Sequence, residues 1–166
     1  MTVRIPIINN TYRPDDSIYV APLSSTLTLT NAKEQLGINW PYPTGSDLGF
    51  HVTFDIPENY SSSPVIVLRG IIDGTPANTF AVGCQQLSRA SSESVDTAYE
   101  AEDTASNGTW TGYADEDIYE ISITLTPASA YVAGDEVFCY IYRDDDVDTT
   151  TFSFILLNAY FEYTEA

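Results

Sequence analysis

The sequence predicts an all-β domain: an antiparallel β-sandwich, most simply a jelly roll, preceded by an extended N-terminal arm. Apolar and polar residues alternate with a period of two along most of the chain, and helical periodicity is almost absent. Turn residues (Gly, Pro, Asn, Asp) separate the alternating segments at a spacing typical of a sandwich. The 166 residues fit one domain, which we place at residues 40–166, with residues 1–39 as the arm.

The arm is predicted from short apolar pieces that Asn, Pro and Asp residues interrupt. Asn31, with Glu34 in capping-box spacing and Gly37 as a terminator, predicts one brief helical turn. An extended arm gains stability only by packing on another surface. We expect the contact to involve Val3, Arg4, Ile5, Ile7, Tyr12, Arg13, Ile18 and Tyr19.

The clearest strand spans residues 50–56. Phe50, Val52 and Phe54 share one face with Ile56, polar residues occupy the other face, and Pro57 ends the run. Further strands are predicted, in order, at residues 65–72, 79–87, 119–125, 137–143 and 152–163.

Residues 89–118 form the most polar part of the chain, with many acidic residues and no basic residue after Arg89. This composition favours long exposed loops. Within it, Asn107-Gly108 supplies the positive backbone angles of a type I′ turn, so the sequence predicts a short hairpin there.

The last two predicted strands are apolar or aromatic on both faces, which is more than one sandwich core absorbs. Either the arm or a neighbouring subunit is expected to cover the second face. The alternative is that both strands are central strands of their sheets and that long loops of the same chain cover them. The residues that we assign to a subunit interface are Phe138, Tyr140, Tyr142, Phe152, Phe154 and Tyr160.

Charge is distributed unevenly. Residues 1–36 carry three basic and three acidic residues, so the rest of the chain holds the whole formal charge of −18. An acidic body repels nucleic acid and anionic lipid, so we expect neither nucleic acid nor a membrane as a partner. No run approaches the roughly 18 apolar residues that span a bilayer, and no secretory leader is evident, so we expect synthesis in the cytoplasm.

Catalytic and metal-binding motifs are weak. His51 is the only histidine and is expected to face solvent. Asp144, Asp146 and Asp148 have a spacing that suits calcium, but the EF-hand pattern fails, and a solvated acidic turn is the favoured interpretation. Glycosidase chemistry requires only two carboxylates at a fixed separation. Because the chain has 24 acidic residues, its composition does not exclude this activity. Cys84 and Cys139 lack metal or redox spacing, so we expect buried reduced thiols rather than a disulfide.

Five short patterns occur within residues 40–163: Trp40-Pro41, Phe50-x-Val52-x-Phe54-x-Ile56-Pro57-x-x-Tyr60, Gly134-Asp-x-Val137, Tyr142-Arg-Asp144 and Phe161-Glu-Tyr163. Together they resemble the small jelly-roll structural proteins of tailed bacteriophages, which include capsid decoration, cement and head-fibre proteins. The resemblance implies a non-enzymatic subunit without a cofactor, often a homotrimer. Such a subunit is made in the host cytoplasm, binds the major capsid protein on the outer surface of the virion and stabilises the capsid.

The alternative is a carbohydrate-binding jelly-roll module of a fibre or receptor-binding protein. Jelly rolls often present exposed aromatic residues to sugar faces, and Trp40, Trp110 and Tyr113 lie in loop-like surroundings. Aromatic residues more often serve core or turn packing, and that interpretation also applies to these three.

Overall fold

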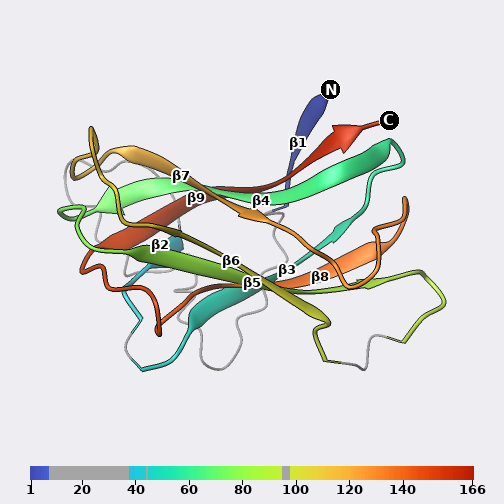
Figure 1. Cartoon of the computed structure of the whole chain (residues 1–166), viewed down its shortest axis with the longest axis horizontal. Coiled ribbons are helices and arrows are strands. Elements are labelled where there is room, and N and C mark those ends of the chain that lie inside the picture. Colours follow the sequence, from blue (N-terminus) through green and yellow to red (C-terminus); the bar gives the residue numbers. More distant parts are fainter. Residues whose placement is uncertain (8–37, 44, 95–97) are drawn as a thin grey trace.

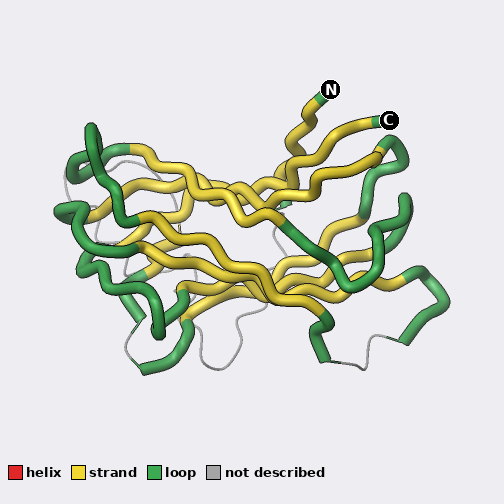
Figure 2. Tube along the Cα trace, viewed as in Figure 1, coloured by secondary structure: helices red, strands yellow, loops and turns green. Residues whose placement is uncertain are grey.

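The computed structural model describes residues 1–7, 38–43, 45–94 and 98–166. Within these residues the secondary structure consists of nine β-strands and no helix (Figure 2). The strands are β1 (Thr2–Pro6), β2 (Ile38–Trp40), β3 (Leu48–Asp55), β4 (Tyr60–Asp73), β5 (Phe80–Arg89), β6 (Ala101–Asn107), β7 (Ile118–Thr124), β8 (Glu136–Arg143) and β9 (Ser153–Glu165).

The strands form two antiparallel sheets that pack face to face (Figure 1). Sheet A has the order β1-β9-β4-β7, with β2 also paired to β9, and sheet B has the order β3-β8-β5-β6. Both sheets contribute buried apolar side chains to one core. The predicted antiparallel β-sandwich is therefore confirmed.

The strand pairs are nested along the chain. β2 pairs with β9, β3 with β8, β4 with β7 and β5 with β6, each in the antiparallel sense. Strands β2 to β5 therefore depend on β6 to β9 for their backbone hydrogen bonds, and most of these contacts join segments that are distant in sequence.

Strands β3 and β7 follow the predicted alternation. In β3, Phe50 and Val52 are buried and Thr53 is exposed, and in β7 the buried Ile123 follows the exposed Ser122. Full burial of an Ile or Phe side chain stabilises a fold by roughly 1.5–3 kcal/mol, so one apolar face per strand is enough to fix which side points inward.

Strand β4 begins at Tyr60 rather than at the predicted Val65, and it passes through Pro64. Its pairing with β9 is irregular before Val65, and Ser63 has a positive φ of 59°. Proline donates no hydrogen bond, so it is tolerated where the pairing is already irregular.

Strand β9 contains one extra residue. Asn158 lies opposite Arg69 of β4, and the next pair is Leu156 with Gly70, so Leu157 has no partner on β4. A residue inserted in this way is a β-bulge, and it reverses the side to which the following residues point. The core-facing residues of this segment are therefore Phe152, Phe154, Leu156, Ala159, Phe161 and Tyr163.

Strand β6 lies inside the segment that the sequence predicts to be loop. Residues 101–107 pair with β5 and alternate between half-buried and exposed. The segment lies at the edge of sheet B and contains no large apolar residue. Its sequence therefore lacks the alternation of apolar and polar residues from which a strand is predicted.

The hairpin predicted at Asn107-Gly108 is wrong. Neither residue has a positive φ, and β6 ends at Asn107, after which the chain crosses to β7 in the other sheet. The Asn107 side-chain oxygen accepts the Thr109 N–H at 3.1 Å, and its amide donates to the Thr109 carbonyl at 3.0 Å. Asparagine therefore makes a local side-chain turn here instead of a type I′ turn.

Two short strands share one edge of β9. β1 pairs with residues 160–164 and β2 pairs with residues 154–156. The N–H of Ile7 donates to the carbonyl of Ala159 at 2.9 Å, so the described N-terminal segment ends close to the part of β9 with which β2 pairs. Both ends of the predicted arm are therefore paired to the sandwich, while residues 8–37 lie outside the described residues.

Candidate functional site

Four of the predicted arm-contact residues belong to the described N-terminal segment. Val3 and Ile5 of β1 pack against the core and Ile7 is buried in it, whereas Arg4 lies on the outer face of sheet A. Ile7 is therefore part of the core, whereas the contact with the capsid that the resemblance implies for Val3, Arg4 and Ile5 stays a prediction. The other four, Tyr12, Arg13, Ile18 and Tyr19, and the helical turn expected at Asn31 lie outside the described residues.

The three candidate calcium ligands do not converge. Asp148 is buried beside Arg143, whereas Asp146 is exposed and its N–H donates to the Asp144 carboxylate at 3.1 Å. Among the residues that the structure describes, no group of three or more His, Cys, Asp or Glu side chains is placed to hold a metal ion. The favoured interpretation, an acidic turn, fits Asp144 and Asp146, whereas Asp148 is buried.

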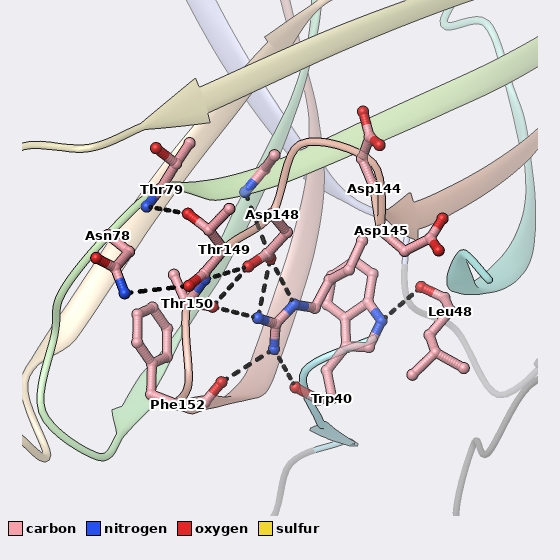
Figure 3. A network of polar contacts seen from close by, with 12 residues as sticks. Trp40, Leu48, Asn78, Thr79, Asp144, Asp145, Asp148, Thr149, Thr150 and Phe152 are labelled. Carbon is pink, nitrogen blue, oxygen red and sulfur yellow. Dashed lines mark hydrogen bonds and ion pairs between the residues drawn. The ribbon is translucent and has the colours of Figure 1, made fainter. Parts of the chain in front are cut away.

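Arg143, at the end of β8, is fully buried. It donates hydrogen bonds to Trp40, Asp148, Thr150 and Phe152, which are labelled in Figure 3. Its Nε donates to Asp148 Oδ2 at 2.9 Å, and its Nη2 donates to Thr150 Oγ1 at 2.6 Å. Its Nη1 donates to the carbonyls of Trp40 at 2.8 Å and Phe152 at 3.2 Å. Burial lowers the pKa of Arg143, while Asp148 favours the charged form. All three guanidinium nitrogens are engaged, so this network joins β2 to the β8–β9 loop.

Asp47 lies beside the same loop, where its Oδ1 accepts the N–H of Asp145 at 3.0 Å. Partial burial raises the pKa of Asp47, the hydrogen bond from the Asp145 N–H opposes that shift, and the carboxylates of Asp145 and Asp144 raise the pKa further, so the net direction is upward. A carboxyl with a raised folded-state pKa is less favourable when charged in the folded than in the unfolded state, so stability falls as the pH rises from the unfolded-state pKa through the folded-state pKa.

We therefore expect Asp47→Asn, which keeps the acceptor oxygen, to increase the free energy of unfolding at neutral pH. The gain should disappear below pH ~3.9, the unfolded-state pKa of aspartate, because Asp47 is then neutral in both states. Urea unfolding at the two pH values measures this. The control is Asp146→Asn, which removes one charge from an exposed position of the same loop. Equal gains in both variants would contradict a specific effect of Asp47.

The aromatic residues considered for sugar binding do not form a common surface. Trp40 is buried, and Trp110 packs against Tyr119 and Phe152 with ring centroids 5.1 and 5.2 Å away. Each indole N–H donates to a backbone carbonyl. Tyr113 alone of the three is exposed, so core and turn packing accounts for both tryptophans.

Of the aromatic residues on the second face of β8, Tyr142 is buried by sheet B itself. The Tyr142 ring lies over Gly83 of β5, where an added Cβ would meet the ring Cζ at 2.2 Å. An added Cβ at Gly49 of β3 would meet the Tyr140 ring at 2.8 Å. Tyr142 is buried in this way, and its hydroxyl donates to Glu102 of β6. Glycines on neighbouring strands therefore accommodate the aromatic rings that the sequence assigns to a subunit interface.

The six predicted interface residues do not form one surface. Tyr142, Phe152 and Phe154 are buried within the chain, which corrects their assignment to a subunit contact. The half-buried residues Phe138 and Tyr140 lie on the outer side of sheet B, whereas Tyr160 lies on the outer side of sheet A. No single partner contacts both sides of a sandwich through the same patch.

A groove of about 590 Å³ follows the outer side of β3 and β8, in the size range of ligand pockets. His51 lies in it with its Nδ1 2.8 Å from the Tyr99 hydroxyl and its ring 4.9 Å from the Tyr140 ring. His51 is therefore half-buried among aromatic residues, and not a solvated strand residue as predicted. The carboxylates that line the groove are Asp55 and Glu136, which lie opposite each other on β3 and β8.

The outer face of sheet A carries a chain of ion pairs. Arg4 donates to Glu162 at 2.5 Å and lies 3.2 Å from Glu120, and Arg69 lies 3.5 Å from the other oxygen of Glu120. These charges come from four adjacent strands and sum to zero.

The two cysteines are free and buried, as predicted. A hydrogen bond with Cys139, together with burial, raises the pKa of the Cys84 thiol. A thiol with a raised pKa is a poor nucleophile and metal ligand at neutral pH, so these residues serve packing.

Neither a protein-family model nor a curated protein matches this sequence. Within the described ranges, no helix has the length and apolarity needed to cross a bilayer.

Proposed function

We propose that the chain is a structural subunit of a tailed-bacteriophage particle, which binds the major capsid protein on the outer capsid surface and stabilises the shell. The sandwich supports the resemblance behind this proposal. Its nested pairs, β2 with β9 through β5 with β6, are what rolling up one long hairpin into a jelly roll produces. An acidic body is repelled by packaged DNA, which favours the outside of the capsid.

The observation that carries the proposal is the position of β1 and β2 on one edge of β9. Residues 8–37 begin and end at that edge, and they contain two basic and three acidic residues, a net charge of −1. The whole chain carries −18. A nearly neutral segment held at one place on an acidic body contacts a partner without the repulsion that the body itself meets.

The test is to replace residues 8–37 by Gly-Ser-Gly. Ile7 lies beside Ala159 and Ile38 lies opposite Leu156, so three residues of β9, or about 10 Å, separate the two ends. The linker spans this gap, so the sandwich is expected to stay folded by circular dichroism. The full chain should co-sediment with assembled phage heads, and the variant should not.

A second variant keeps residues 8–37 in shuffled order, which preserves length and charge, and it should also lose binding. Full binding by the deletion variant would contradict the role of this segment. Failure of the full chain to bind heads at all would contradict the proposed function.

The carbohydrate-binding alternative has less support, because the two tryptophans on which it depends are packed against the protein. A hydrolase has no specific support either.

A further inference from the structure

The groove along the outer side of β3 and β8 has one charged end. Asp55 and Glu136 lie directly opposite each other on the two strands, so their carboxylates are on the same side of sheet B. Both residues are exposed, and within the described residues neither carboxylate has an ion pair or a side-chain hydrogen bond. Like charges that face each other destabilise a strand pair, so a cation placed between these two is favourable.

The arginine in register with this pair is directed elsewhere. Arg89 of β5 lies opposite Glu136, but its Nη2 donates to Glu100 at 2.6 Å and its Nε donates to the Ser94 carbonyl at 2.9 Å. The other described arginines lie on the outer face of sheet A or in the core. A cation that pairs with both groove carboxylates therefore comes from outside the described structure.

An aromatic ring adjoins the charged end. Phe138 follows Glu136 by two residues on the same side of β8, is half-buried, and lies opposite the exposed Thr53 of β3. Two residues of a strand span ~6.6 Å, so this ring lies about one side-chain length from the carboxylates. His51 and Tyr99 line the groove beyond it. The groove therefore fits a ligand that carries a positive charge at the end of an apolar stem.

We propose that this groove binds an arginine side chain of a partner protein, with the guanidinium between Asp55 and Glu136 and the methylene stem over Phe138. A guanidinium has five N–H donors in a planar fork, so it can pair with two carboxylates at once. It is also more weakly hydrated than an ammonium group and packs well beside a ring. The groove volume of about 590 Å³ exceeds one side chain, which leaves room for the neighbouring residues of the partner. The inference does not depend on capsid binding.

NMR titration of the isotope-labelled full chain with the capped peptide acetyl-Gly-Ser-Arg-Ser-Gly-amide tests this. We expect saturable shifts of the backbone amides of residues 51–55 and 136–138. The same peptide with citrulline, which keeps the shape of arginine but has no charge, should bind at least ~10-fold more weakly. The lysine peptide should bind about 3-fold more weakly than the arginine peptide, because an ammonium group lacks the planar fork.

Two variants remove the proposed contacts one at a time. Asp55→Asn and Glu136→Gln should each weaken binding of the arginine peptide at least ~5-fold. Both residues are exposed, so the remainder of the spectrum should stay unchanged and report an intact fold. The matched control is Asp146→Asn, which removes one exposed carboxylate from the loop at the other end of β8, and it should change the affinity less than ~2-fold.

Equal binding of the citrulline peptide, or an equal loss of affinity in Asp146→Asn, would show only a general attraction to an acidic protein and would overturn the proposal. Absence of binding up to about 10 mM peptide would also overturn it. So would saturable binding of a neutral oligosaccharide at the same residues in place of the peptide, which would assign the groove to a sugar.

A basic residue of the same chain is the remaining alternative occupant. Residues 8–37 contain Arg13 and Lys33 but carry a net charge of −1, so the segment as a whole is not attracted to an acidic groove. Binding of the peptide only after the combined change Arg13→Gln and Lys33→Gln would assign the groove to this segment and contradict a partner. Because no phage heads are used, these results are independent of the head-binding test.

Discussion

Replacing Arg143 by methionine is expected to lower the free energy of unfolding by about 3–5 kcal/mol, because it leaves the buried Asp148 carboxylate without its counter-charge. The carbonyls of Trp40 and Phe152 lose their guanidinium donor in the same step. An unsatisfied buried polar group costs more than its hydrogen bond contributes.

Urea unfolding measures this difference, and Arg69→Met is the matched control. The Arg69 side chain is 43% exposed and its ion pair with Glu120 is 3.5 Å long, so its loss should cost no more than ~1 kcal/mol. Arg143→Met combined with Asp148→Leu should be less destabilising than the sum of the two single changes, because it removes both buried charges. Equal costs for the two arginine variants would contradict a structural role for the network.

The parts of the fold that could be predicted are those with a local apolar pattern. β3 and β7 alternate regularly, and their spacing together with the prolines that follow them predicts both strands. The sequence does not predict β6, because an edge strand without large apolar residues has no such pattern. The pairing of β1 and β2 with β9 joins opposite ends of the chain, and no local feature of the sequence reports it.

The candidate surfaces were harder to predict for the same reason. The sequence of its own strand places Tyr142 at a subunit interface. Only the contact of its ring with Gly83 on a neighbouring strand shows that the chain itself buries it. Asp148 belongs by sequence to a solvated acidic run, and only Arg143 in the folded chain makes it a buried partner. The aromatic residues of β9 seem two-sided until the bulge at Leu157 reverses their direction.

Gly49→Ala tests the close contact of β3 with β8, and we expect it to lower the free energy of unfolding by about 1–3 kcal/mol. The new Cβ would lie 2.3 Å from the Ile141 carbonyl oxygen and 2.6 Å from the Tyr142 Cβ. The nearest atom belongs to the backbone, so the strands themselves must move apart. Gly108→Ala is the control, because its Cβ would meet nothing closer than 3.5 Å and the residue has no positive φ.

Gly83→Ala separates this backbone contact from a side-chain contact. Its Cβ would meet the ring end of Tyr142 at 2.2 Å, so adding Tyr142→Ala should remove the clash and make the double variant more stable than additivity predicts. The same second change should not rescue Gly49→Ala, since the Ile141 carbonyl and the Cβ at position 142 both remain. Urea unfolding of the two double-mutant cycles distinguishes the cases. If Gly49→Ala were as stable as Gly108→Ala, β3 would lie farther from β8 than the structure places it, and the aromatic cover of sheet B would not depend on its glycines.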